Sequence, residues 1–134
     1  MAGQRGPANR DARLEACQQA IGYRFDDLEL LDRCLTHASV APIRLESNER
    51  LEFLGDAILG AIVCERLFER YPESPEGELT RIKSIVVSGS SCAEMSEQIG
   101  LERFLRIGKG LAGGRGVPQS IFAAAFESMV AGIF

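Results

Sequence analysis

The segment from Asn48 to Arg70 constrains the fold more than any other part of the chain. It contains no proline and is rich in apolar residues, so it predicts one long helix of roughly 34 Å at 1.5 Å per residue. The apolar side chains cover nearly every direction around that helix: Leu51, Phe53, Leu54, Ala57, Ile58, Leu59, Ile62, Val63, Leu67 and Phe68. Such a helix is expected to be buried on most sides by neighbouring helices.

The same helix also carries a stripe of carboxylates. Glu49, Glu52 and Asp56 stand at positions i, i+3 and i+7, which places them within about 60° of one another at roughly 100° per residue. Because like charges repel, something positive is expected against the stripe. One interpretation is an exposed stripe paired with Arg50 or with arginines of other helices. The other is a divalent metal such as Mg²⁺, which prefers carboxylate oxygens. The spacing leaves both interpretations open.

Helical periodicity extends along almost the whole chain and predicts an all-α fold class. Gly22 and Gly100 are expected to stop two of the helices. Further helices are predicted over residues 11–21, 26–36, 77–88, 90–99 and 118–134. The expected N-terminal caps are Ser47 or Asn48 for the long helix, and Ser90 or Ser91 for the helix over 90–99.

Composition favours one globular domain over residues 1–134, because the chain has 134 residues and 46% of them are hydrophobic. The net charge of −4 argues against general electrostatic attraction to nucleic acid, although a local site remains possible. The apolar stretches are too short for a membrane span, so a soluble, cytoplasmic protein with no membrane partner is expected. The widely spaced cysteines are interpreted as reduced core residues: Cys17, Cys34, Cys64 and Cys92. The apolar ending MVAGIF suggests the front part of a longer protein.

Four blocks of this sequence resemble the ribonuclease III family, in the family's order. The string NERLEFLGDAIL is similar to the family signature, and IGYRFDDLELLDRCLTHASV to the helices and T-H-x-S segment before it. PEGELTRIKSIVVS resembles the helix after the signature, and LRIGKGLAGGRGVPQSIFAAAFESMVAGIF the approach to the second catalytic helix. The resemblance implies the family's endonuclease-domain fold, a helical bundle with the signature helix central and with dimerisation through it.

The resemblance also implies a concrete function and site. It implies cleavage of double-stranded RNA with staggered cuts, leaving 5′-phosphate and 3′-hydroxyl ends, in rRNA and mRNA maturation. Glu52, Asp56 and Glu127 would hold Mg²⁺, with Mn²⁺ possible, and Glu49 would complete the catalytic set. Phe53 would pack into the partner subunit of a homodimer. The family's double-stranded-RNA-binding domain is not present in these 134 residues.

One position departs from the family pattern. The family places an acid three residues before the glutamate of the last helix, where this chain has Ala124. Three interpretations follow: a natural variant with a working site, an inactivated or engineered version, and a non-catalytic relative that serves as a dimeric RNA-binding or ribonucleoprotein scaffold. Magnesium accepts water in place of a missing side chain, so Ala124 alone does not exclude activity.

Three smaller features complete the sequence predictions. The glycine-rich segment GKGLAGGRGVP is expected to be a connecting loop before the last helix. Its G-x-G-x-x-G string at 108–113 lacks the strand and acid of a dinucleotide loop, so no nucleotide cofactor is expected; Lys109 and Arg115 are candidates for RNA contact. His37 precedes Ser39 and is expected to make a local hydrogen bond. Gly55 is expected to allow close helix packing, since glycine otherwise costs a helix about 1 kcal/mol.

Overall fold

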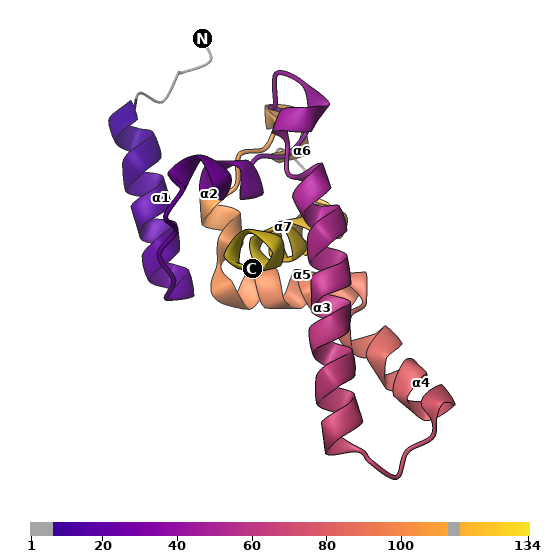
Figure 1. The fold of residues 1–134 in the computed structure, drawn as a ribbon. Coiled ribbons are helices and arrows are strands. Elements are labelled where there is room, and N and C mark those ends of the chain that lie inside the picture. Colours follow the sequence, from indigo (N-terminus) through magenta and orange to yellow (C-terminus); the bar gives the residue numbers. More distant parts are fainter. Residues whose placement is uncertain (1–6, 113–115) are drawn as a thin grey trace.

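The computed structural model describes residues 7–112 and 116–134, and these residues form an arrangement of helices (Figure 1). The α-helices are α1 (Pro7–Ile21), α2 (Leu28–Cys34), α3 (Glu49–Arg70), α4 (Glu76–Val86), α5 (Gly89–Ile99), α6 (Lys109–Ala112) and α7 (Gln119–Ile133). Two 3₁₀ helices, η1 (Arg44–Glu46) and η2 (Leu101–Phe104), lie between them. The all-α prediction is confirmed, and within the described ranges no helix is long and apolar enough to cross a membrane.

The glycine stops are confirmed, whereas one cap and one loop were predicted wrongly. Gly22 and Gly100 adopt positive φ angles of 68° and 78°, a conformation that favours glycine. The cap of α5 is Ser88, whose side chain accepts a hydrogen bond from the backbone N–H of Ser91. The glycine-rich segment after 107, predicted as a loop, contains the short helix α6. Helix α1 begins four residues before the predicted start, in a polar stretch without periodic apolar residues.

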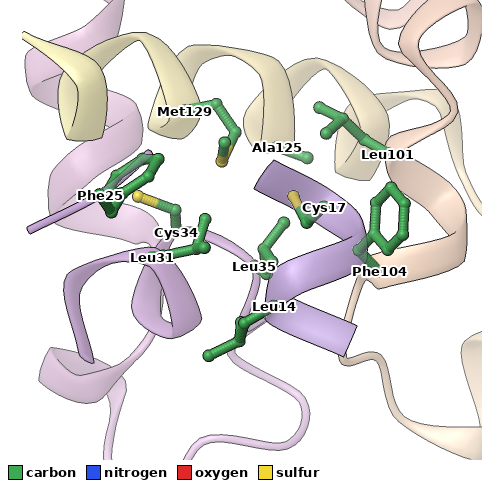
Figure 2. Packing of buried hydrophobic residues seen from close by; sticks show 10 residues of the cluster. All are labelled: Leu14, Cys17, Phe25, Leu31, Cys34, Leu35, Leu101, Phe104, Ala125 and Met129. Atoms are coloured by element: carbon green, nitrogen blue, oxygen red, sulfur yellow. The ribbon is translucent and has the colours of Figure 1, made fainter. Parts of the chain in front are cut away.

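The main hydrophobic core forms where α1, α2, η2 and α7 converge. Figure 2 shows side chains from these elements pointing toward one another, with α7 on one side and α1 on the other. Its buried members are Leu14, Cys17, Phe25, Leu31, Cys34, Leu35, Leu101, Phe104, Ala125 and Met129. Helix α5 packs on α7 through a second, smaller cluster of Cys92, Ala93 and Ala123. Helices α2, α3 and α5 therefore all pack on α7.

A nearly buried acid ties α1 to the rest of this packed half. Asp32 of α2 accepts hydrogen bonds from Arg10 and Arg13 of α1, and Arg106 lies 3.6 Å from the same carboxylate. Burial by itself would raise the pKa of Asp32, but the hydrogen bonds from the two α1 arginines and the charges of Arg13 and Arg106 outweigh it and lower that pKa. The ionised carboxylate is thus the form that holds α1 in place.

Helix α3 crosses α7 at Gly55, and the two backbones nearly touch there. A Cβ atom added to Gly55 would lie 1.7 Å from the backbone oxygen of Glu127, which is far inside van der Waals contact. The prediction of close packing at Gly55 is confirmed. Farther along α3, the side chain of Lys83 from α4 lies over Gly60, with its Cε 3.5 Å from where a Cβ would be. The part of α3 that follows this crossing, together with α4, extends away from α5 and α7 (Figure 1).

The expectation that α3 is buried on most sides is wrong for this chain by itself. Its buried residues are Gly55, Gly60 and Leu67 alone, and α4 has none. Large apolar side chains of the two helices remain open to solvent, and we call them the exposed apolar set: Phe53 (83%), Leu54 (46%), Ile62 (51%), Phe68 (75%), Ile85 (58%) and Val86 (46%). The sequence pattern shows which faces of a helix are apolar. The number of helices packed against it determines how many of those faces are buried.

The cysteine prediction holds for three of the four residues. Cys17, Cys34 and Cys92 are buried, whereas Cys64 is exposed on α3. All four are free thiols. Desolvation raises the pKa of Cys17 to about 11 and that of Cys34 to about 12, so both behave as apolar core groups.

The segment after α2 is fastened to the segment after η2. The backbone N–H of Arg106 donates to Leu35, and His37 donates back to Arg106. The His37 ring nitrogen Nδ1 lies 2.8 Å from the Ser39 hydroxyl, which confirms the predicted local hydrogen bond. Ser39 in turn accepts a hydrogen bond of 2.8 Å from the backbone N–H of Gly108. This series of bonds holds the residue before Lys109 in place.

Candidate active site

The fold brings the acids of α3 to the acid of α7. Glu49 and Glu52 lie in the first turn of α3, and Asp56 follows one turn later on the side of the crossing at Gly55. Glu127 lies on α7, and its backbone oxygen forms the other side of that crossing. The charges of Asp56 and Glu52 act on Glu127, and those of Glu49 and Asp56 act on Glu52. The two halves of the predicted site therefore share one electrostatic environment.

The electrostatics of these acids favour a cation. Desolvation, followed by the charges of Glu49 and Asp56, raises the pKa of Glu52 above its ordinary value. Desolvation, followed by the charges of Asp56 and Glu52, raises the pKa of Glu127 in the same way. Each acid is harder to ionise because the others are already negative. A bound cation would relieve this repulsion, since it neutralises charges that the protein itself leaves close together.

Ion pairing accounts for only one of the four acids. Glu49 lies 3.5 Å from the guanidinium of Arg44 in η1, an exposed pair. In the parts of the chain that the structure describes, no lysine or arginine forms a salt bridge with Glu52, Asp56 or Glu127. The salt-bridge interpretation is thus confirmed for Glu49, whose partner is Arg44 and not Arg50. Among the described residues, no cationic side chain neutralises the other three acids.

The donor chemistry suits a hard divalent ion, although the side chains do not form a closed ligand cage. Among residues 7–112 and 116–134, no group of three or more His, Cys, Asp or Glu side chains converges closely enough to hold a metal ion. Asp56 is exposed, and Glu52 and Glu127 are half-buried, so their carboxylates can turn about the side-chain torsions. Carboxylates and water are the ligands that Mg²⁺ prefers. Glu52, Asp56 and Glu127 fit such an ion by chemistry and charge.

A thiol that the sequence analysis did not connect with the site also lies beside it. Cys92 of α5 is 1% exposed, and its thiol donates to the backbone carbonyl of Val87 over 3.7 Å. Burial, followed by the charge of the nearby Glu127 carboxylate, raises the pKa of Cys92 to about 11. The thiol therefore remains protonated at neutral pH and adds no further negative charge to the acid group.

The remaining predicted positions are Ala124, Lys109 and Arg115. Ala124 is 8% exposed, in the stretch of α7 where Ala123 and Ala125 are also buried. Lys109 is exposed at the start of α6, directly after the Gly108 that Ser39 holds. Arg115 lies outside the described residues.

The sequence analysis did not connect two polar residues beside the acids with the site. Asn48 precedes Glu49, and Ser128 follows Glu127; both are buried and both hydrogen-bond to the carbonyl of Cys34. The available signal for Ser128 was a serine in the largely apolar string AAAFESMVAGIF. Ser47 or Asn48 had been expected to cap α3. The Ser47 hydroxyl accepts from the N–H of Glu49 at 3.3 Å, whereas the Asn48 side chain makes no capping hydrogen bond.

Comparison with known proteins places the chain in a family. A family model described as "Ribonuclease-III-like" matches residues 27–134. The chain is 50% identical to a ribonuclease 3 from Rhodopirellula baltica, over 95% of this chain and 48% of that protein, and 43% identical to one from Symbiobacterium thermophilum, over 88% and 51%. It thus spans about half the length of these curated relatives.

A solved structure agrees with this match. The ribonuclease III nuclease domain of Campylobacter jejuni, whose structure is described as flexible in a region involved in dimer formation, superimposes with a TM-score of 0.83 at 33% identity, covering 90% of this chain and 83% of that one. Since the family model covers most of the chain and the helical fold matches this nuclease domain, the chain belongs to the ribonuclease III family.

Proposed function

We propose that this chain is the catalytic domain of a divalent-metal-dependent endoribonuclease that cleaves double-stranded RNA to 5′-phosphate and 3′-hydroxyl ends, for RNA processing. One observation carries the proposal: Glu52, Asp56 and Glu127 come from two crossing helices into one electrostatic environment, without a cationic side chain paired to them among the described residues. Membership of the family and the identity to proteins named ribonuclease 3 support the same activity.

Glu52, Asp56 and Glu127 would hold the metal, Mg²⁺ or in its place Mn²⁺, and Glu49 would support them. When bound, the ion lowers the pKa of water and neutralises charge on a phosphodiester. Gly55 lets the two acid-bearing helices approach, and the buried Cys92 beside Glu127 stays protonated, so it adds no negative charge to the site. Without a cation, the acids would repel the phosphate backbone of RNA.

We further propose a homodimer in which Phe53 packs against the partner subunit. Phe53 is 83% exposed in the single chain, and it belongs to the exposed apolar set of α3 and α4. Large exposed apolar areas mark interaction surfaces in soluble proteins. The related Campylobacter structure is described as having a region involved in dimer formation. Two sites in a dimer would cut the two strands of a duplex with a stagger.

Cleavage of a labelled RNA duplex tests the proposal. The 134-residue chain with Mg²⁺ or Mn²⁺ is expected to release staggered products, and Glu127→Gln is expected to reduce the rate by about 100-fold or more, since a lost metal ligand removes several kcal/mol of transition-state stabilisation. Glu97→Gln, on α5 outside the acid group, serves as a matched control. Lys109→Ala is expected to raise KM with little change in kcat, because an exposed cation would contact phosphate and not the reacting group.

Ala124 favours a second candidate function, a non-catalytic scaffold that binds RNA as a dimer. The family pattern has an acid at this position, and here the side chain is a buried methyl group. Absence of product at high protein concentration, together with gain of cleavage in Ala124→Asp, would indicate a site disabled by this one residue. Absence of product in both proteins, with duplex binding retained, would favour the scaffold and contradict the endonuclease.

A further inference from the structure

We propose that Asn48 and Ser128 are positioning residues that hold the two acid-bearing helices at a common point, the backbone carbonyl of Cys34. This inference rests on the proposed metal site and adds to it the residues that place its two halves. Among the described residues, neither side chain hydrogen-bonds with an acid's carboxylate, so neither is proposed as a ligand or a catalytic group. Their role is to define the position of α3 relative to α7.

The first contact fixes the start of α3. Asn48 is 3% exposed, and its side-chain amide donates a hydrogen bond of 3.2 Å to the carbonyl oxygen of Cys34. Its backbone N–H donates to the carbonyl of Thr36 at 2.9 Å, and its own carbonyl accepts from the N–H of Glu52 at 2.8 Å. Glu49 is the next residue in the chain. The first turn of α3, with two of the acids, is thereby attached to the end of α2.

The second contact fixes α7 next to Glu127. Ser128 is fully buried, and its hydroxyl lies 2.8 Å from the same Cys34 oxygen and 2.9 Å from the carbonyl of Ala125, one turn back on α7. The Cys34 oxygen is the nearer acceptor and the one on another helix. The Cys34 thiol contacts the Ser128 carbonyl in return, with the sulfur 3.4 Å from that oxygen. Cys34 and Ser128 are therefore joined in both directions.

The shared acceptor is suited to this role. Cys34 is the last residue of α2, and the final carbonyls of a helix have no partner within the helix. A carbonyl oxygen has two lone pairs, so it can accept from Asn48 and Ser128 together. The close contact at Gly55 permits α3 and α7 to approach. Packing has little directional preference, so by itself it does not fix how far one helix is shifted along the other. Hydrogen bonds to one atom have direction and remove that freedom.

A matched pair of buried serines makes the inference testable. Ser96 on α5 is also fully buried, but its hydroxyl has no hydrogen-bond partner among the described residues. Ser128→Ala and Ser96→Ala remove the same atom from equally buried sites, and only the first removes a link to Cys34. If Ser128 contributes only to packing, the two substitutions should affect metal binding to the same extent. If Ser128 positions α7, only Ser128→Ala should weaken metal binding.

The experiment measures Mn²⁺ binding to the 134-residue chain by the electron paramagnetic resonance of the free ion, with circular dichroism on each sample to verify folding. Ser128→Ala and Asn48→Ala are expected to weaken Mn²⁺ binding by about 10-fold, the scale at which supporting residues act on metal affinity. Ser96→Ala is expected to bind as the wild type does. The Asn48→Ala/Ser128→Ala double variant is expected to lose less than the product of the single losses, because the two residues share one acceptor.

Glu127→Gln separates failure of the inference from failure of the proposed function. If Glu127→Gln weakens Mn²⁺ binding while Ser128→Ala binds normally, the positioning role is overturned and the metal site stands. If Ser96→Ala weakens binding as much as Ser128→Ala, loss of packing explains both, and the positioning role is also overturned. If Glu127→Gln leaves binding unchanged, or the wild type binds no Mn²⁺, the proposed metal site fails and the inference fails with it.

Discussion

The packed half of the molecule and the α3–α4 hairpin use apolar residues very differently. In the packed half, α1, α2, η2, α7 and the two residues Phe25 and Leu35 that flank α2 bury ten apolar side chains in one cluster, as Figure 2 shows. In the hairpin, α4 buries no residue and α3 exposes large side chains such as Phe53 and Phe68. Several helices distant in sequence converge on the first region, whereas α4 and the part of α3 that follows its crossing with α7 extend away from them (Figure 1). Similar apolar content thus gives a core in one region and an uncovered surface in the other.

The contact between the two regions, where α3 crosses α7, is where we expect a single substitution to destabilise the fold most. Gly55→Ala would place a Cβ atom 1.7 Å from the backbone oxygen of Glu127, so the helices must separate. We expect a loss of about 3 kcal/mol in the free energy of unfolding, measured by urea denaturation. Gly77→Ala on α4, where an added Cβ has nothing within 4 Å, is expected to stabilise the chain by about 0.5 kcal/mol. Equal effects of the two substitutions would contradict the close approach of α3 and α7.

The packed half can be weakened separately through its buried carboxylate. Asp32→Asn removes the charge that Arg10 and Arg13 bind, so we expect a loss of about 2 kcal/mol in the free energy of unfolding at pH 7. Exposed Asp26→Asn is the control and is expected to change stability little.

The pH dependence of this effect follows from the lowered pKa of Asp32. A group whose pKa is lower in the folded state stabilises the fold above its unfolded-state pKa, because the ionised form is favoured there. The advantage of the wild type over Asp32→Asn is therefore expected in full above about pH 5, and it should be lost as pH falls below the ordinary value of 3.8 and through the lowered pKa. Urea titrations between pH 7 and pH 2 measure it, and a difference that is independent of pH would exclude the ionised carboxylate as its source.

A substitution in the α3–α4 hairpin is expected to change the stability of the single chain least. Its main effect is expected on the association of two chains. Phe53→Glu places a charge on an exposed position, so the fold is expected to persist while the dimer Kd rises by about 10-fold or more. Sedimentation at several protein concentrations measures the Kd. Leu45→Glu in η1 replaces another exposed apolar residue, 65% exposed, outside α3 and α4, and it is expected to leave association unchanged. A dimer that survives Phe53→Glu would show that Phe53 is not part of its interface.

Much of the candidate site was predictable because its residues follow a local pattern. The spacing of Glu49, Glu52 and Asp56 put them on one side of a helix, and the family string supplied Glu127. Their mutual electrostatic influence in the fold agrees with that grouping. Asn48, Ser128 and Cys92 were not predicted in their present roles, because each depends on a group of another helix. The cap of α5 was misplaced by two to three residues, since serines at 88, 90 and 91 are equivalent by residue type alone.

The sequence by itself determined the longer helices, their glycine stops and the family, because periodicity, the turn preference of glycine and contiguous strings are local properties. The short helices η1, η2 and α6 were not predicted. The tertiary structure alone decided which apolar faces are covered and where buried polar groups find partners. Asn48 illustrates the difference: residue type favours a helix cap, yet its amide donates to Cys34, fourteen residues earlier in the chain. The physical reason is that a buried amide requires a partner, and the packing of α2 beside α3 and α7 brings it a carbonyl at a helix end, where carbonyls have no partner in their own helix.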